Sequence, residues 1–225
     1  MGSSESSRDP GPSVRLMLFC AGFAPIGALC LAAFGALPLS VGATVLVAPA
    51  IITVLAVATR APRAAARGLA LGILAVFVYD VVCRLPFVAM GVWHDFIPRI
   101  GDHLLRRKDV HWSVGYLWRY LGNGGGMGLA FYSVYPLIGK KIPSPFLGVA
   151  YGVSIYVCLL ATLFLSPHGQ EYLFVPTPET AYLGFLGHVI YGWVLGYGAW
   201  RWDRTAATIP SKIMSSERSH QHSYG

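Results

Sequence analysis

The stretch Leu71–Gly91, LGILAVFVYDVVCRLPFVAMG, decides the fold, because it is apolar almost throughout and is interrupted by only two charged side chains. A helix needs about 20 such residues, at 1.5 Å each, to cross the hydrocarbon core of a bilayer. Backbone polar groups find no water in lipid, so a spanning segment of this kind is helical. The alternating pattern of a membrane β-barrel is absent from the sequence.

The composition extends this interpretation to the whole chain. The 225 residues are 55% hydrophobic and 12% charged, whereas soluble domains carry about 25% charged residues. We therefore predict an all-α, polytopic membrane helix bundle with about six transmembrane helices. The stretches long enough to span are Leu16–Ala36, Leu39–Thr59, Gly68–Trp93, Ser113–Ile138, Phe146–Leu165 and Thr180–Trp200.

The domain organisation follows from where polar residues occur. Residues 1–13 and 205–225 are polar and are predicted to be disordered tails around a transmembrane domain over residues 14–204. Within that domain the polar side chains that need explaining concentrate in residues 68–200, which we expect to be the functional unit. The cysteines have no metal-type spacing and lie within predicted spans, so we expect neither disulfides nor bound metal: Cys20, Cys30, Cys83 and Cys158.

The net charge of +7 is distributed as in a membrane protein rather than a nucleic-acid-binding one. With the amino terminus inside, most lysines and arginines fall in inner segments, and the positive-inside rule then places both termini in the cytoplasm of a cell with the protein in its cell membrane. The basic run Arg106-Arg107-Lys108 lies in an outer loop and is discordant. That loop, Asp95–His111, has the pattern of an interfacial amphipathic helix.

A buried polar site is predicted from intramembrane charges. Asp80 and Arg84 are four residues apart and share a helix face, and intramembrane ionisable groups are usually functional. The topology places Arg119, Asn123 and His188 at a comparable depth in the outer half of the membrane. Alternatively, Asp80–Arg84 is a packing ion pair, Arg119 reaches the interface and His188 is a packing residue beside small residues.

Other side chains would complete such a site. Aromatic rings within the spans stabilise developing cations by about 0.5–2 kcal/mol, and we expect Trp118, Tyr120 and Tyr191 to line it. Two carboxylates in the outer loop after the fifth span, Glu171 and Glu179, are alternative proton donors. A metal at the outer surface is disfavoured, because the spacing of the candidate ligands matches no known site: His94, Asp95, Asp102, His103 and His111. Paired aspartates, GxSxG and HExxH are also absent, and no cofactor is expected.

Three segments resemble patterns in small bacterial multi-spanning membrane proteins of uncharacterised function: YDVVCRLPF from Tyr79, GYLWRYLGNGGGMGLAFY from Gly115 and GHVIYGWVLG from Gly187. The resemblance covers about residues 68–200 and implies a shared fold, although those proteins often have a histidine where this chain has Arg119. By size, hydrophobicity and aromatic content the chain also resembles the integral-membrane terpene cyclases of meroterpenoid and indole-terpenoid pathways. That resemblance implies acidic residues that start cyclisation by protonation.

Two functional hypotheses follow. In the first, the protein is an integral-membrane enzyme acting on a hydrophobic isoprenoid-type substrate, most concretely a proton-initiated terpene cyclase. Its catalytic residues would be Asp80, as proton donor or relay, Glu171, Glu179 and His188, and its substrate-binding residues Arg84, Arg119, Asn123, Trp118, Tyr120 and Tyr191. Two arginines would, however, keep Asp80 ionised, which suits a base better than an acid. In the second, the protein is a small transporter, with a homodimer compensating for its few helices. A structural subunit without chemistry is the third alternative.

Overall fold

The computed structural model describes residues 10–38, 61–105, 112–138 and 144–221, and within these ranges the regular structure is helical, without strands. The predicted helical fold class is therefore confirmed. The second predicted span, Leu39–Thr59, lies outside the described residues. The helices are α1 (Pro12–Ala33), α3 (Pro62–Tyr79), η2 (Asp80–Arg84), α4 (Leu85–Ala89), α5 (Ile97–Leu105), α6 (Trp112–Leu117), η3 (Trp118–Gly125), α7 (Gly126–Ile138), α8 (Ser144–Leu165), α9 (Gly169–Tyr172) and α10 (Pro178–Gln221).

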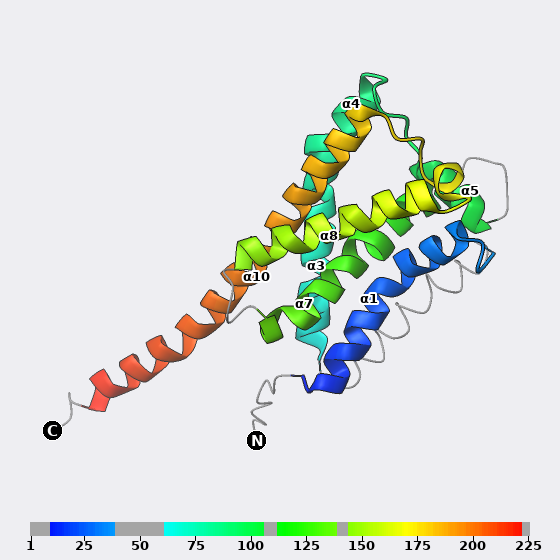
Figure 1. Ribbon diagram of the computed structural model, residues 1–225. Coiled ribbons are helices and arrows are strands. Elements are labelled where there is room, and N and C mark those ends of the chain that lie inside the picture. The colour runs from blue at the N-terminus through cyan, green and yellow to red at the C-terminus, as the bar shows by residue number, and fades with distance from the viewer. Residues whose placement is uncertain (1–9, 39–60, 106–111, 139–143, 222–225) are drawn as a thin grey trace.

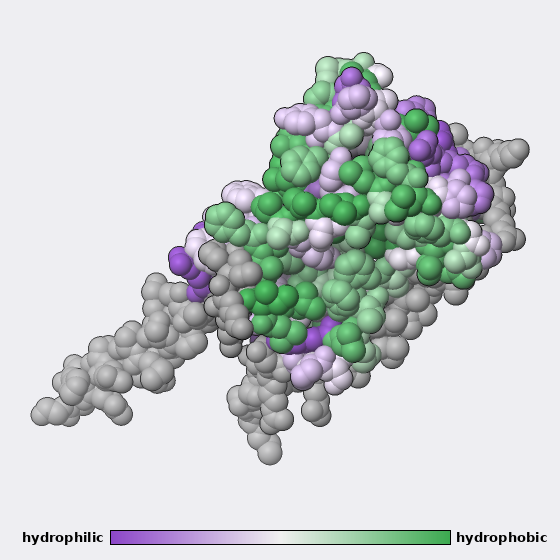
Figure 2. Space-filling model, viewed as in Figure 1, coloured by the Kyte–Doolittle hydropathy of each residue, from purple (hydrophilic) through white to green (hydrophobic). Residues whose placement is uncertain are grey.

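Three of the described helical runs are long and apolar enough to cross a membrane: Pro12–Ala33, Pro62–Ala89 and Ser144–Leu165. Large hydrophobic side chains such as Phe77, Phe146 and Phe164 remain more than half exposed on them. Hydrophobic residues cover most of the face seen in Figure 2, and hydrophilic residues gather toward its ends. An apolar outer surface of this extent is what a lipid-facing bundle needs.

Two helical runs contain a segment of π-helix, which is wider than an α-helix: the apolar run Pro62–Ala89 contains η2, and the run formed by α6 and α7 contains η3. In η2 the backbone N–H of Leu85 donates to the carbonyl of Asp80, five residues earlier. Pro86 follows immediately and has no amide hydrogen to continue the α-helical pattern. The second segment, η3, ends in the glycines Gly122, Gly124 and Gly125, whose lack of side chains relaxes the backbone constraint. Such segments occur frequently at functional sites, and these two carry Asp80, Arg84 and Arg119.

Glycines allow the helices to approach closely. A Cβ atom on Gly148 or Gly152 of α8 would collide with backbone atoms of Gly192 or His188 on α10. Gly72 of α3 lies against Gly124 in the same way. The small residues beside His188, including Gly192 and Gly196 of α10, therefore form a helix contact surface, as small residues usually do in membrane bundles.

The two ends of the bundle differ. Figure 1 shows the start of α1 and the far end of α10 on the lower side, with α4 and α5 on the opposite side. The amphipathic pattern of the Asp95–His111 loop forms α5, which buries Ile97, Ile100 and Leu104. Helix α10 extends from Pro178 to Gln221 and so includes residues of the predicted C-terminal tail.

Candidate functional site

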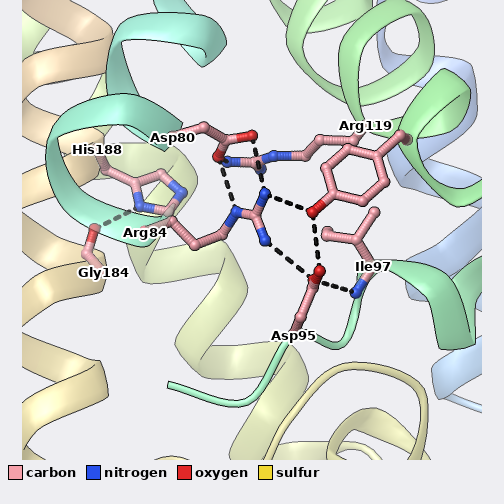
Figure 3. Close-up of polar contacts among 8 residues, drawn as sticks. Asp80, Arg84, Asp95, Ile97, Arg119, Gly184 and His188 are labelled. Atoms are coloured by element: carbon pink, nitrogen blue, oxygen red, sulfur yellow. Dashed lines mark hydrogen bonds and ion pairs between the residues drawn. The ribbon is translucent and has the colours of Figure 1, made fainter. Parts of the chain in front are cut away.

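Asp80 is the centre of a buried ion network. Its side chain has no exposed surface, and its Oδ1 accepts hydrogen bonds from Arg84 Nε at 3.0 Å and Arg119 Nη2 at 2.7 Å. Its Oδ2 accepts a third from Arg84 Nη2 at 3.2 Å. Figure 3 shows the Asp80 carboxylate beside the guanidinium groups of Arg84 and Arg119. The structure therefore brings together the charges that topology predicted to meet, from η2 and η3.

A second carboxylate completes the network from the segment before α5. Arg84 Nη1 donates to Asp95 Oδ1 at 2.9 Å, and Tyr116 OH joins Arg84 Nη2 at 3.1 Å to Asp95 Oδ2 at 2.8 Å. The backbone N–H of Ile97 also donates to Asp95, at 3.1 Å. In the sequence Asp95 is recognisable only as a candidate metal ligand, so this role was not predicted. The available signal was charge balance, because two buried arginines require two carboxylates.

We call Asp80, Arg84, Asp95, Arg119 and Tyr116 the ion network, which has two negative and two positive charges. Charge-assisted hydrogen bonds from guanidinium groups stabilise the ionised carboxylate. Both carboxylate oxygens of Asp80 therefore accept hydrogen bonds from guanidinium groups. It is an unsuitable proton donor, and its role in this arrangement is to orient the two arginines.

A cavity of about 280 Å³ lies beside the ion network. Arg84, Arg119, Asn123 and His188 contribute polar atoms to its wall. The remaining wall is mostly apolar and comes from α1, α8 and the segments near α5 and α9, with aromatic rings from Phe23, Tyr79, Trp93, Phe96, Trp118 and Phe174. A largely apolar cavity with a few convergent polar groups is the usual form of a small-molecule site.

His188 presents one ring nitrogen that has no hydrogen bond to the described residues. Its Nδ1 lies 2.7 Å from the carbonyl oxygen of Gly184, and a carbonyl can only accept, so Nδ1 carries a hydrogen. The ring packs against Tyr79 at 5.5 Å and Tyr156 at 5.4 Å between centroids. The imidazole is thus fixed in orientation on the cavity wall, and Nε2 is the nitrogen left for exchanging a proton.

Two buried N–H donors have no hydrogen-bond partner among the described residues: Trp93 Nε1 and Arg119 Nε. Both residues line the cavity, but these two nitrogens are themselves inaccessible. Trp93 is 3% exposed and Arg119 is 9% exposed. Buried donors are nearly always satisfied in native structures.

The other predicted substrate-binding residues are divided between the cavity and its surroundings. Trp118 and Asn123 line the main cavity. Tyr191 lines a smaller adjoining space of about 30 Å³ and donates its hydroxyl to the Gly124 carbonyl at 2.8 Å. Tyr120 stacks on Tyr116 at 6.5 Å between ring centroids, and so lies against the ion network instead.

The two loop carboxylates predicted as alternative acids lie away from the cavity. Glu171 of α9 is exposed and pairs with His168 at 3.0 Å. Glu179 is exposed at the start of α10, where its own backbone N–H and Thr177 lower the pKa of its carboxyl. Neither side chain is among the residues that line the cavity. Glu171 and Glu179 were predicted as acids because they lie in the outer loop after the fifth predicted span. In the structure their side chains are exposed instead.

Comparisons with protein families, curated proteins and solved structures found no match to this chain. The function must therefore be argued from the site itself. In the part of the chain that the structure describes, no three His, Cys, Asp or Glu side chains gather as a metal site would need. His111 lies outside the described residues.

Proposed function

We propose that this protein is an integral-membrane enzyme that acts on a hydrophobic, isoprenoid-type substrate. The proposal depends on the cavity of about 280 Å³. Its wall is mostly apolar and aromatic, it contains a few polar side chains, and it lies within an apolar helix bundle. A substrate that partitions into lipid would enter such a site, with its hydrocarbon part against the rings and its polar end at Arg119 and His188.

The proposed chemistry is an isomerisation by proton transfer, most concretely a terpene cyclisation. From a neutral resting state, His188 takes up a proton at Nε2 and donates it to the substrate, the carbon skeleton closes, and Nε2 then removes a proton from the resulting cation and releases it. The product is then an isomer of the substrate and the enzyme returns to its starting state. The ring of Trp118 stabilises the positive charge in between. Asp80 is a positioning residue in this scheme, because its oxygens are occupied by the two arginines.

We also propose the placement in the membrane. The three described apolar runs, the second predicted span and the helices that contain η3 and the first part of α10 would give six spans. The distribution of lysine and arginine favours a cell membrane with both termini in the cytoplasm. The ion network and the cavity then lie in the outer half of the bilayer, near α5.

The transporter hypothesis is less well supported by the site. A polar transport path needs charged groups that are free to meet a solute. Asp80 and Arg84 instead direct their hydrogen bonds at each other, Arg119, Asp95 and Tyr116. We therefore propose no transport function.

The test uses membranes that contain the full chain, a panel of neutral prenylated substrates, and mass spectrometry for products of unchanged mass. Wild type is expected to form an isomer, and His188→Ala to form it at least about 100-fold more slowly, which is the lower range for losing a general acid–base group. His168→Ala is the matched control, because this exposed histidine lies outside the cavity.

Two results would contradict the proposal. One is full activity in His188→Ala, which would remove the proton-transfer scheme. The other is the absence of any altered isoprenoid with wild type, combined with uptake of a solute into vesicles that is lost in Asp80→Asn. That second result would restore the transporter hypothesis.

A further inference from the structure

We infer that the cavity opens sideways into the bilayer between α1 and α8, and that it takes prenyl chains longer than itself, whose tails extend through this opening into the lipid. The inference rests on the proposed function, in that it names the substrate class of the same site. It depends on the contacts between α1 and α8, on exposed residues that also line the cavity, and on open space at one glycine of α1.

Two contacts between α1 and α8 bound the opening. Elsewhere α1 packs on α7, and α8 packs on α10. At one end, the rings of Phe23 and Tyr151 lie 6.5 Å apart between centroids. At the other end, Cys30 Sγ lies 3.5 Å from Thr162 Oγ1. The two contacts are about 10 Å apart along the axis of α1. Residues of both helices between these contacts line the cavity, and we call this stretch the window.

The cavity reaches the molecular surface at the window. Ser154 and Cys158 of α8 line the cavity and are also exposed. On the α1 side Gly27 lines the cavity, and a Cβ atom placed there would meet no atom within 4 Å. Gly22 of the same helix is different, because its Cβ would collide with the backbone of Gly126 on α7. Helix packing therefore explains Gly22, whereas the small size of Gly27 leaves the window open.

The window faces the lipid. Helices α1 and α8 are two of the described runs that are apolar enough to cross a membrane. Leu31 and Val157, next to the window on the two helices, are exposed hydrophobic residues. Figure 2 shows that the face across which α8 runs is mostly hydrophobic. An opening in such a surface admits a hydrocarbon chain from the membrane more readily than a solute from water.

The position of the polar groups sets the direction of the occupant. Arg119, Asn123 and His188 of the cavity wall belong to η3 and α10, whereas α1 and α8 bound the window. A chain with its polar end at the former directs its tail toward the latter. An apolar cavity of about 150 Å³ holds benzene, so one of about 280 Å³ holds roughly two isoprene units. Further units lie in the lipid, and chain length is therefore not limited by the cavity.

The test is photo-cross-linking of the full-length protein in phosphatidylcholine vesicles. The probe is a 20-carbon prenyl alcohol that carries a diazirine on its last isoprene unit, and mass spectrometry of peptides locates its adducts. We expect adducts at residues 26–30 and 154–158, which form the two sides of the window. An excess of unlabelled geranylgeraniol is expected to suppress them, because both molecules compete for one cavity.

Two variants of α1 locate the route. Gly27→Leu places a branched side chain in the window, so the suppressible adducts are expected to fall roughly tenfold. Its melting temperature is expected to match that of wild type, because the new side chain enters open space. Cys20→Leu is the matched control, since Cys20 is exposed on the same helix and does not line the cavity. It is expected to be labelled as wild type is.

Three results would overturn the inference and leave the proposed function in place. These are suppressible adducts at Phe96 and Phe174 instead of at the window, unchanged labelling in Gly27→Leu, and window adducts that excess prenyl alcohol does not suppress. The last result would mean that the probe labels the protein from bulk lipid only. The absence of suppressible adducts from the whole cavity wall would overturn both the inference and the proposed function.

Discussion

Asp80 and Arg84 are the most deeply buried charges among the described residues, at 0% and 1% exposure. Neither could remain ionised there alone, because a buried charge needs a partner and hydrogen bonds to replace water. Arg119 and Asp95 complete the set from two other segments. The four charges therefore act as a unit, and removing one of them leaves the others unbalanced.

Asp80→Asn is expected to destabilise the protein by about 3–5 kcal/mol, because it leaves Arg84 and Arg119 with one carboxylate between them. Thermal unfolding in detergent measures the change. The same carboxylate-to-amide replacement at the exposed Glu179 is the control and is expected to leave the melting temperature unchanged. A melting temperature for Asp80→Asn equal to that of wild type would show that the ion network contributes little to folding.

Asp95→Asn is expected to change ligand preference more than stability, since this side chain is 25% exposed and lies at the edge of the network. The variant leaves the wall with one excess positive charge. Its affinity for a prenyl carboxylate is expected to rise about tenfold over wild type, from the Coulomb attraction at short range in a partly buried site. Titration of the purified variant and of wild type in detergent with that carboxylate measures this. An unchanged carboxylate affinity would argue against charge balance as the basis of selectivity.

At the scale of the helices, the site depends on how closely α8 and α10 approach. Gly152 lies directly against the backbone of His188, the residue that faces the cavity. Any side chain at Gly152 would push α10 outward and carry His188 with it. The glycines thus set the position of a functional residue, in addition to packing two helices together.

Gly152→Ala is expected to destabilise the protein by about 1–3 kcal/mol through overpacking. Gly27→Ala on α1 is the matched control, because a Cβ there meets no atom within 4 Å. It is expected to be neutral or to stabilise by up to about 1 kcal/mol, as alanine favours a helix more than glycine does. Unfolding of both variants in one detergent measures the difference. Equal free energies of unfolding for Gly152→Ala and Gly27→Ala would mean that α8 and α10 can move apart without loss of stability.

At the scale of the whole molecule, orientation in the membrane sets which side the cavity faces. The start of α1 and the end of α10 lie on one side of the bundle, and α4 and α5 lie on the other (Figure 1). This arrangement agrees with the same-side termini that the charge distribution predicts. The ion network belongs to the end that carries α5, because Asp95 precedes that helix.

Single cysteines introduced after replacing the four native ones by alanine test this orientation. A cysteine at Glu171, which is exposed beside α9, is expected to react with a membrane-impermeant maleimide in intact cells. One at Lys212 is expected to react only after the cells are opened. The reverse pattern would invert the proposed topology and place the cavity in the inner half of the bilayer.

Much of the fold was predictable, because length and hydropathy are properties of consecutive residues. The third span is one continuous helical run, Pro62–Ala89, and the amphipathic Asp95–His111 pattern contains α5. The spacing of Asp80 and Arg84 also placed them correctly on one face. The π-helical form of η2 and η3 was not predicted, since it depends on hydrogen bonds that hydropathy does not report.

Local composition and spacing already specify apolar helices that carry an aspartate and two arginines. The packing of segments distant in sequence brought Asp95 to Arg84, left Glu171 and Glu179 exposed, and enclosed a cavity beside the ion network. The physical reason is that hydrogen-bond satisfaction and enclosed volume belong to segments packed together in space. A one-dimensional pattern contains neither.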